Sequence, residues 1–222
     1  MPRFDGAIFD LDGTLIDSLA DIAHAANRTL EHLGKPVWPI EAYKQFVGDG
    51  VNFLFHRALP ETVEDAELLA RCVAVYKQEY ERSWDNLTKP YPGIPEMLEA
   101  CLAHGLKLAV FSNKPHPFTL ACVERFFPAV PFSHVVGQGD RFPKKPDPSG
   151  AIWIASQITS QSHRIAYVGD TNTDMKTATG ANLFAIGVAW GFRDIPEIRE
   201  AGAQEICHTA DQLKNLLVSR RA

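Results

Sequence analysis

The feature that most restricts the fold of this chain is a series of short apolar runs, each followed directly by polar or turn-forming residues. The clearest runs cover residues 7–9, 106–111, 165–168 and 183–188. Helix-like patterns separate them, at about 94–104, 116–127, 147–157 and 173–180. Short strands that alternate with helices indicate a parallel sheet with helices on both faces. The sequence therefore predicts an α/β protein with a doubly wound, Rossmann-like parallel sheet.

One long segment interrupts this alternation. From residue 17 to about residue 84 the pattern is helical, with apolar residues at helical spacing from Leu19 to Leu33 and Gly34 as a helix stop. The segment 89–93, rich in proline and glycine, is typical of a linker that returns the chain to the sheet. We therefore expect a core domain of residues 1–16 and 89–222, with a helical domain of residues 17–88 inserted after the first strand.

Composition and charge exclude several classes of function. The chain of 222 residues has a net charge of -5, which disfavours non-specific binding to nucleic acid or to anionic membranes. Its four cysteines show no C-x-x-C spacing, so we expect reduced thiols rather than a zinc site or disulfides. No apolar run has the length of a membrane span or of a signal peptide. We expect a cytoplasmic protein with neither a nucleic-acid nor a membrane partner.

The strongest local signal is Asp10-Leu11-Asp12-Gly13-Thr14, directly after the first apolar run. A carboxylate such as Asp10 can attack phosphorus to form an acyl phosphate, which divides one difficult hydrolysis into two easier steps. A second carboxylate, Asp12, can protonate the leaving oxygen and then deprotonate the water that cleaves the intermediate. Gly13 permits a sharp turn, and Thr14 can hydrogen-bond to hold it. An acidic surface turn is the alternative interpretation of the same residues.

Two further groups offer contacts for a phosphate. Ser112 and Asn113 follow the run 106–111, and their hydroxyl and amide groups could hold a phosphoryl oxygen. The same pair could instead cap a helix, so this signal is weak by itself. Lys145, in a loop before a predicted helix, could offset the charge on a phosphate and on an attacking carboxylate. A lysine beside a proline is also common in solvated loops.

The last polar group follows the run 165–168. Asp170 stands there, and its carboxylate could complete a magnesium site with Asp10, because Mg²⁺ prefers hard oxygen ligands. In doubly wound sheets the functional residues gather beyond the carboxyl ends of the strands, where both residues are predicted to lie. Asp174 could bind the metal through water or cap the following helix, and capping is the expectation for its direct contacts.

In this order, the motifs resemble those of the haloacid-dehalogenase-like hydrolase superfamily, and the resemblance spans almost the whole chain. It implies a mobile helical cap, here residues 17–88, on the doubly wound core. It also implies that Asp10 is the nucleophile and Asp12 the acid and base. By the same resemblance Mg²⁺ binds to Asp10, to the backbone carbonyl of Asp12 and to Asp170. The implied substrate is a small-molecule phosphate ester, bound by Thr14, Ser112, Asn113 and Lys145.

Finer features resemble the branch of this superfamily that hydrolyses 2-phosphoglycolate. They are Val47-Gly48-Asp49-Gly50 and Arg57 in the helical segment, Ser112-Asn113-Lys114-Pro115, and Trp190-Gly191-Phe192-Arg193. The Lys145 motif is one step shorter than the Lys-Pro-x-Pro-x-Pro often found in that branch. We expect the Gly48-Asp49-Gly50 turn and Arg57 to contact the leaving group, which in 2-phosphoglycolate carries a carboxylate.

Several alternatives remain open from the sequence. A pyrophosphatase, a sugar-phosphate phosphatase and a phosphomutase of the same fold would share these motifs. A dehalogenase is disfavoured, because a departing halide has no need of the acid that Asp12 supplies. A phosphonate hydrolase usually has alanine at that position. A phospho-accepting receiver domain, from another functional class, is much shorter and places an acidic pair upstream of its phosphorylated aspartate. A monomer and a homodimer are both compatible with the sequence.

Overall fold

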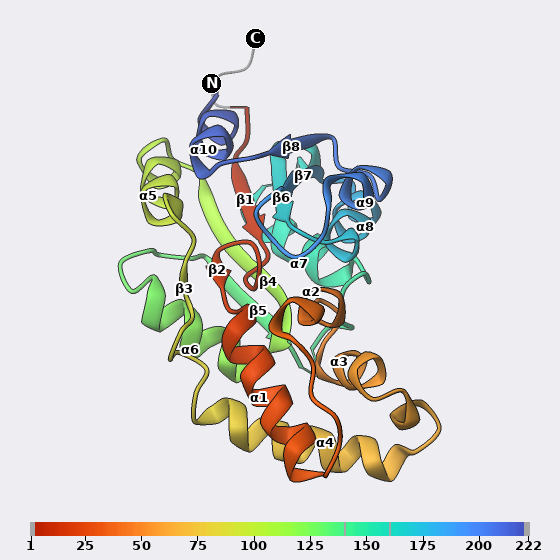
Figure 1. Cartoon of the computed structure of the whole chain (residues 1–222). Coiled ribbons are helices and arrows are strands. Elements are labelled where there is room, and N and C mark those ends of the chain that lie inside the picture. Colours follow the sequence, from red (N-terminus) through yellow and green to blue (C-terminus); the bar gives the residue numbers. More distant parts are fainter. Residues whose placement is uncertain (1–2, 140, 160, 220–222) are drawn as a thin grey trace. The chain divides into compact units, whose positions relative to one another are not determined.

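The computed structural model describes residues 3–139, 141–159 and 161–219. The chain divides into two compact units (Figure 1). The larger unit comprises Met1–Ile16 and Pro90–Ala222, and the smaller unit comprises Asp17–Lys89. Where the chain passes between them, β2 (Ile16–Asp17) and β3 (Lys89–Pro90) pair in a separate two-stranded sheet. None of the helices in the described ranges combines the length and the hydropathy needed to cross a membrane.

The larger unit is built on a six-stranded sheet with the strand order β5-β4-β1-β6-β7-β8, in which neighbouring strands are parallel. The strands are β1 (Gly6–Phe9), β4 (Lys107–Pro115), β5 (His134–Gln138), β6 (Ile165–Gly169), β7 (Phe184–Val188) and β8 (Glu205–Cys207). The first strand lies inside the sheet, and later strands are added on both of its sides, which is the doubly wound arrangement. The predicted fold class is confirmed.

Helices connect these strands and cover both faces of the sheet (Figure 1). They are α5 (Ile94–Ala103), α6 (His116–Phe126), α7 (Ser149–Ile158), α8 (Asn172–Gly180), α9 (Ile195–Glu200) and α10 (Ala210–Val218). On one face α5 packs against α10 and β4, and on the other face α7 and α8 pack against the central strands. The buried cluster under α7 and α8 includes Ile8, Phe111 and Tyr167. Branched and aromatic side chains of this kind favour a strand that is covered by helices.

The register of the sheet brings distant parts of the chain to one edge. Phe9 of β1 is level with Val110 of β4 on one side and with Val168 of β6 on the other. The backbone N–H of Asp10 donates to the carbonyl of Val168 over 2.9 Å, which ties the end of β1 to β6. Because the three strands run in the same direction, the polar residues after β1 and β6 and those in the last part of β4 lie at the carboxyl edge of the sheet.

The smaller unit is helical, with α1 (Leu19–His32), α2 (Tyr43–Phe46), α3 (Val51–Ala58), α4 (Ala66–Glu81) and 3-10 turns at Ile40–Ala42 and Pro60–Val63. The long helices α1 and α4 pack together, and the predicted apolar stripe of α1 is buried at Ile22, Ala26 and Leu30. Gly34 follows α1 with a φ of 66°, and its N–H donates to the carbonyl of Glu31 over 2.9 Å. The predicted helix stop is therefore present.

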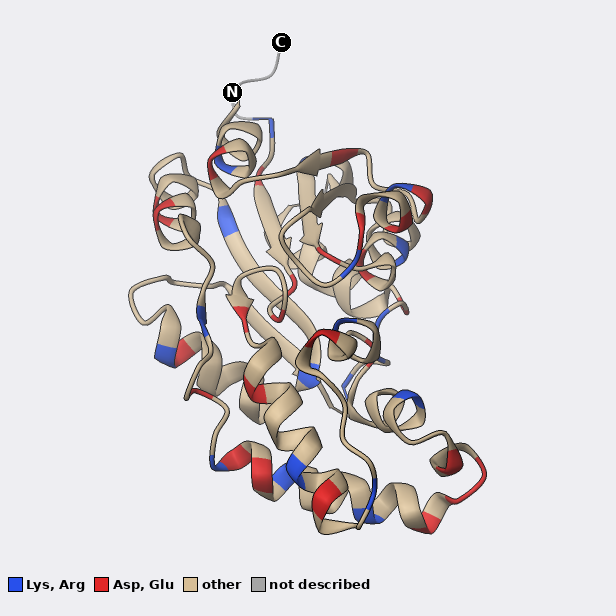
Figure 2. Ribbon diagram, viewed as in Figure 1, with Lys and Arg blue, Asp and Glu red and all other residues tan. Residues whose placement is uncertain are grey.

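Polar contacts complete the smaller unit. One carboxylate oxygen of Asp21 accepts hydrogen bonds from the N–H groups of Leu87 and Thr88, over 2.9 and 2.8 Å. These bonds tie the start of α1 to the segment that follows α4. Arg28 Nε donates to Glu79 over 2.8 Å and joins the same two helices. Acidic and basic residues are otherwise interspersed along α1 and α4 (Figure 2).

Candidate active site

Asp10 stands where β1 ends and a tight turn begins. The carbonyl of Leu11 accepts hydrogen bonds from the N–H groups of Leu15 and Ile16, over 2.9 and 3.1 Å, and these bonds close the turn. Gly13 lies inside it with a φ of 84°, in the left-handed region that favours glycine. A Cβ at this position would lie 2.3 Å from a carboxylate oxygen of Asp170. Glycine is therefore required both by the backbone and by the carboxylate beside it.

Asp170 follows β6 and is held by two donors from distant parts of the chain. The Thr14 hydroxyl donates to Oδ1 over 2.8 Å, and the backbone N–H of Phe192 donates to Oδ2 over 2.8 Å. The indole Nε1–H of Trp190 donates to the carbonyl of Thr14 over 3.1 Å. The predicted motifs around Thr14, Asp170 and Trp190 thus meet in one network, and the carboxylate of Asp170 has a fixed orientation.

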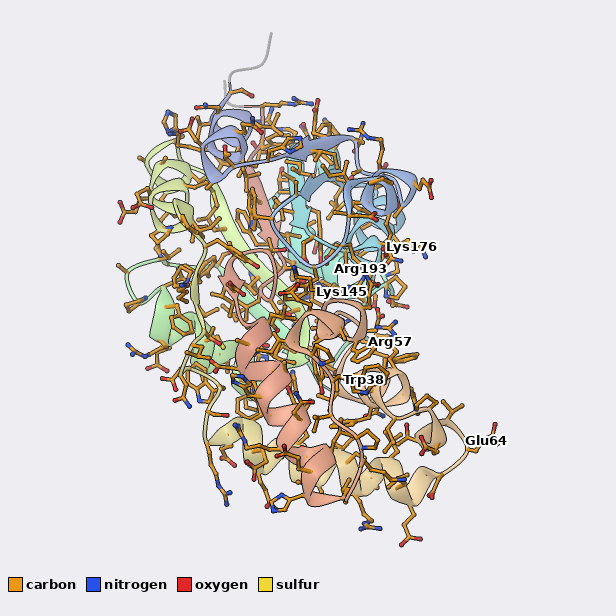
Figure 3. The ribbon with its side chains drawn as sticks, viewed as in Figure 1. Trp38, Arg57, Glu64, Lys145, Lys176 and Arg193 are labelled. Atoms are coloured by element: carbon orange, nitrogen blue, oxygen red, sulfur yellow. The ribbon has the colours of Figure 1, made fainter. Side chains whose placement is uncertain are left out.

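Lys145 places a positive charge beside the carboxylates of Asp10 and Asp174 (Figure 3). Its side chain is almost completely buried, and its Nζ lies 2.9 Å from Asp10 Oδ1 and 2.7 Å from Asp174 Oδ1. The loop that carries it is fixed by Asn113, whose amide accepts from the Lys145 N–H over 2.8 Å and donates to the Lys145 carbonyl over 3.1 Å. Both the oxygen and the nitrogen of the Asn113 amide are therefore hydrogen-bonded to the backbone of Lys145.

Asp174 has two structural roles at once. Its Oδ2 accepts from the N–H and the hydroxyl of Thr171, over 3.1 and 2.7 Å, and its own N–H donates to the Thr171 hydroxyl over 3.3 Å. This reciprocal arrangement is a capping box at the start of α8. Its other oxygen, Oδ1, accepts the hydrogen bond from Lys145. The expected capping contact is present, and the direct ion pair with Lys145 is a contact that the sequence did not predict.

Asp12 lies in the turn that follows β1 and pairs with Lys114. The ammonium of Lys114 donates to both carboxylate oxygens of Asp12, over 2.8 and 3.1 Å. The exposed fraction of the side chain is 12% for Asp12 and 3% for Lys114. Ser112 lies two residues before Lys114 on β4, and its buried hydroxyl accepts from the Lys114 N–H over 3.3 Å. The sequence placed Lys114 in a motif but assigned it no contact.

The carboxylates of Asp10, Asp170 and Asp174 form one buried cluster in which an oxygen of each lies within 4.8 Å of the others. Burial, together with the charges of Asp174 and Asp12, raises the pKa of Asp10 to about 6 against the opposing effect of Lys145. Burial and the charges of Asp174 and Asp10 raise the pKa of Asp170 well above its ordinary value. Three carboxylates facing a single buried ammonium leave an excess of negative charge.

The pKa of Lys145 is raised as well, which for an ammonium favours the charged form. Burial by itself lowers the pKa of an ammonium, but the carboxylates of Asp10 and Asp174 raise the pKa of Lys145 above its ordinary value. Asp10 Oδ1 is buried and, among the described residues, receives no hydrogen bond of acceptable geometry, although Lys145 Nζ is 2.9 Å away. The pair is therefore held by charge rather than by an aligned hydrogen bond. A hard divalent cation fits this set of oxygen donors, because it would satisfy that oxygen and offset the excess charge.

An open parallel sheet with a buried acidic cluster and a lysine at its carboxyl edge defines an α/β protein with a candidate active site at the place where such sheets bind ligands. A family model described as haloacid dehalogenase-like hydrolase matches residues 7–188. The chain therefore belongs to the haloacid dehalogenase-like hydrolase family, and the predicted family and the prediction of an enzyme are confirmed.

Individual relatives agree with this assignment. A phosphoglycolate phosphatase of Nitrosospira multiformis is 34% identical over 203 residues, which are 90% of this chain and 89% of that protein. A phosphoglycolate phosphatase of Chromobacterium violaceum is 34% identical over 212 residues, 93% of this chain and 95% of that protein. A solved structure from Lactobacillus delbrueckii subsp. bulgaricus superposes with a TM-score of 0.91 at 30% identity and covers 99% of this chain and 100% of that one.

Proposed function

We propose that this protein is a Mg²⁺-dependent phosphatase that hydrolyses 2-phosphoglycolate, or a closely similar small ester, through an aspartyl-phosphate on Asp10. The observation that carries the proposal is the buried carboxylate of Asp10, placed 2.9 Å from the ammonium of Lys145 at the end of a central strand. The relatives named phosphoglycolate phosphatase support the choice of substrate.

Asp10 is suited to act as the nucleophile. A pKa of about 6 leaves its carboxyl group mostly ionised at neutral pH, so an oxygen lone pair is available to attack phosphorus. The tie between its N–H and the Val168 carbonyl fixes its backbone, and Lys145 fixes the position of Oδ1. Such preorganisation removes part of the entropic barrier to attack.

Asp12 is proposed as the general acid and base. Its side chain is partly exposed, in contrast to the three carboxylates of the buried cluster, and it lies two residues from the nucleophile on the same turn. It would protonate the leaving oxygen in the first step and take a proton from the attacking water in the second. Its pairing with Lys114 fixes the direction in which the carboxylate points.

The metal would be held by the carboxylates of Asp10 and Asp170 and by the backbone carbonyl of Asp12. When bound, Mg²⁺ supplies positive charge that offsets the charge of the phosphoryl oxygens. Asp174 lies in the same cluster, but its oxygens accept from Lys145 and Thr171, so we assign it the role of positioning Lys145. Phe192 and Thr14 hold Asp170 in the orientation that the metal needs.

The phosphate would be contacted by the Ser112 hydroxyl and the Lys145 ammonium. The other two residues that the resemblance implied, Thr14 and Asn113, make contacts of a different kind. Thr14 donates to Asp170, and the amide of Asn113 is bound to the backbone of Lys145. We therefore assign Thr14 and Asn113 the role of positioning the metal ligand and the phosphate-binding lysine.

The helical unit Asp17–Lys89 is proposed as the cap that limits the size of the substrate. In the sequence this unit is inserted after β1, between the proposed nucleophile and the remaining strands of the core, and this insertion supports the role. Arg57 was expected to contact the leaving group. In the structure its guanidinium pairs with Asp49 and donates to the Phe46 carbonyl over 3.1 Å (Figure 3). Its charge is therefore already balanced within the helical unit.

Phosphate release from a panel of esters, with and without Mg²⁺, tests the proposed function. We expect 2-phosphoglycolate to exceed pyrophosphate and glucose 6-phosphate by about tenfold or more in kcat/KM, which corresponds to about 1.4 kcal/mol of transition-state binding. Chelation should abolish activity, and Mg²⁺ or Mn²⁺ should restore it better than Ca²⁺, which takes a looser coordination. A tenfold preference for another ester would reject 2-phosphoglycolate alone, whereas full activity without metal would reject the metal-dependent mechanism.

A further inference from the structure

The ion pair between Lys114 and Asp12 places a buried positive charge beside the proposed acid. Lys114 Nζ is 2.8 Å from Asp12 Oδ1, and the side chain of Lys114 is only 3% exposed. Both residues belong to the larger unit, with Asp12 on the turn after β1 and Lys114 near the end of β4. Their contact joins the two motifs directly, over 102 positions of sequence separation.

Asp12 marks the leaving-group side of the site. To protonate the leaving oxygen, its carboxyl group must come within hydrogen-bond distance of that oxygen, about 3 Å. Lys114 Nζ therefore lies within about two hydrogen-bond lengths, roughly 6 Å, of the leaving oxygen. Lys145, in contrast, pairs with the nucleophile and with Asp174, on the side of the attacking oxygen. In the proposed reaction the two buried lysines would thus accompany different oxygens, Lys145 the oxygen that attacks phosphorus and Lys114 the oxygen that leaves.

The separation between Lys114 Nζ and the leaving oxygen is compatible with the dimensions of 2-phosphoglycolate. In such an ester the carboxylate oxygens lie about 3 Å from the ester oxygen, because only two carbon atoms intervene. A carboxylate at that distance would repel Asp12 if no cation stood near. Lys114 removes this penalty and offers a charge-assisted hydrogen bond in its place. On the basis of the proposed function, we propose that Lys114 is the specificity-determining residue that recognises a carboxylate on the leaving group.

Arg57 is the competing candidate for this contact; both residues already pair with a carboxylate, and the unit to which each belongs distinguishes them. The guanidinium of Arg57 is held by Asp49 and by the Phe46 carbonyl within the helical unit. Lys114 lies instead in the unit that contains Asp10, Asp12 and Lys145. Recognition by Lys114 thus needs no particular position of the helical unit. The residue that would bind the carboxylate of the leaving group is also the residue that holds the proposed acid, Asp12.

The test compares two isosteric substrates, 2-phosphoglycolate and its neutral amide, 2-phosphoglycolamide. Lys114→Gln removes the charge but keeps an N–H donor for Asp12. We expect this variant to lose about tenfold or more in kcat/KM on 2-phosphoglycolate relative to its loss on the amide, the usual size of a charge-assisted contact. Lys114→Arg keeps the charge and should retain most of the preference. Lys107 is an exposed lysine at the start of the same strand, and Lys107→Met should leave kcat/KM unchanged on both substrates.

The outcomes separate the inference from the proposed function. Equal losses on both substrates, in folded Lys114→Gln and Lys114→Arg proteins checked by thermal unfolding, would show that Lys114 only positions Asp12 and would overturn the inference. A selective loss in Arg57→Ala, with none in the Lys114 variants, would also overturn it and assign recognition to the helical unit. Wild-type protein that hydrolyses the two substrates equally would reject carboxylate recognition but leave the phosphatase intact. Wild-type protein that hydrolyses neither substrate nor any other ester would reject the proposed function itself.

Discussion

At the scale of single residues, the site is a set of charges that are costly to bury without a cation. Burial and the nearby carboxylates raise the pKa values of Asp10 and Asp170, and for Asp10 the charge of Lys145 compensates only in part. A raised pKa means that the protonated forms of Asp10 and Asp170 are more populated than those of an exposed carboxyl group at the same pH. We therefore expect the arrangement to destabilise the metal-free protein at neutral pH and to favour binding of the proposed divalent cation, a cost typical of residues that function rather than stability selects.

Asp10→Asn should stabilise the metal-free protein at neutral pH. The pKa of Asp10 is raised from 3.8 to about 6 in the folded state, so its favourable contribution is fully present below pH 3.8 and is lost as the pH rises through about 6. Asparagine mimics the protonated carboxyl group and avoids this loss. We expect a gain of about 1–3 kcal/mol in the free energy of unfolding near neutral pH, which vanishes below about pH 4.

Thermal unfolding in chelator across this pH range measures the effect, and addition of Mg²⁺ provides a second readout. Mg²⁺ should raise the Tm of the wild type at neutral pH and raise that of Asp10→Asn much less. Asp211→Asn is the control, because Asp211 is exposed and its pKa is lowered by hydrogen bonds with Lys214. An Asp10→Asn protein less stable than the wild type at every pH would show that the pair with Lys145 outweighs burial and repulsion.

At the scale of secondary-structure elements, the start of α8 connects folding to the site. The Thr171 hydroxyl accepts from the Asp174 N–H and donates to Asp174 Oδ2, so one side chain both caps the helix and orients a carboxylate. The other oxygen of that carboxylate holds Lys145. A Cβ at Gly169 would lie 2.3 Å from the Asp174 side chain, so glycine there leaves the room that this packing needs. The capping box is therefore part of the site as well as of the helix.

Thr171→Ala should reduce both stability and activity. Loss of an N-cap hydroxyl costs about 1 kcal/mol, or roughly 2–4 °C in Tm for a chain of this size. Loss of the bond to Asp174 should also misplace Lys145 and lower kcat about tenfold, the usual effect of removing a supporting contact. Calorimetry and steady-state kinetics measure the two effects separately.

Thr209→Ala is the matched control for Thr171→Ala. Thr209 caps α10 through the N–H of Gln212 over 3.2 Å, on an exposed surface. This variant should lose similar stability and keep its kcat. Equal kcat values for the two variants would show that the capping box serves only the helix.

Several elements could be predicted from the sequence, and the exceptions have physical reasons. The strands β1, β4, β6 and β7 were predicted because their apolar runs are buried under helices. The edge strands β5 and β8 were not predicted, because edge strands are partly exposed and their patterns mix polar with apolar residues. β4 also extends further than expected, to Pro115, because Ser112, Asn113 and Lys114 stay buried within the strand.

The same distinction applies to the candidate site. The positions of Asp10 and Asp170 at one edge follow from the parallel strands that periodicity predicts. The partners of the charged side chains in the site do not follow, because the contacts between Lys114 and Asp12 and between Lys145 and Asp174 join residues far apart in sequence. A lysine in a buried strand is the signal that could have identified Lys114, since a buried ammonium needs a carboxylate partner.

At the scale of the whole molecule, the two units divide the proposed tasks. The groups proposed for phosphoryl transfer belong to the unit of Met1–Ile16 and Pro90–Ala222. The helical unit is inserted between β1 and the remaining strands of the main sheet, and paired segments at β2 and β3 connect it. An insertion connected in this way can vary without disturbing the sheet. The account therefore has one central claim, which is that Asp10 carries the phosphoryl group.

Identification of the phosphorylated residue tests this claim most directly. Asp12→Asn protein, in which loss of the acid should slow formation of the intermediate and loss of the base should slow its hydrolysis, is mixed with 2-phosphoglycolate and Mg²⁺. It is quenched within one turnover of this slowed enzyme and treated with borohydride. Borohydride reduces an aspartyl-phosphate to homoserine, which peptide mass spectrometry can locate. We predict homoserine at position 10 in proportion to the glycolate released. Release of glycolate with an unmodified Asp10, or with the phosphoryl group on another residue, would contradict the account.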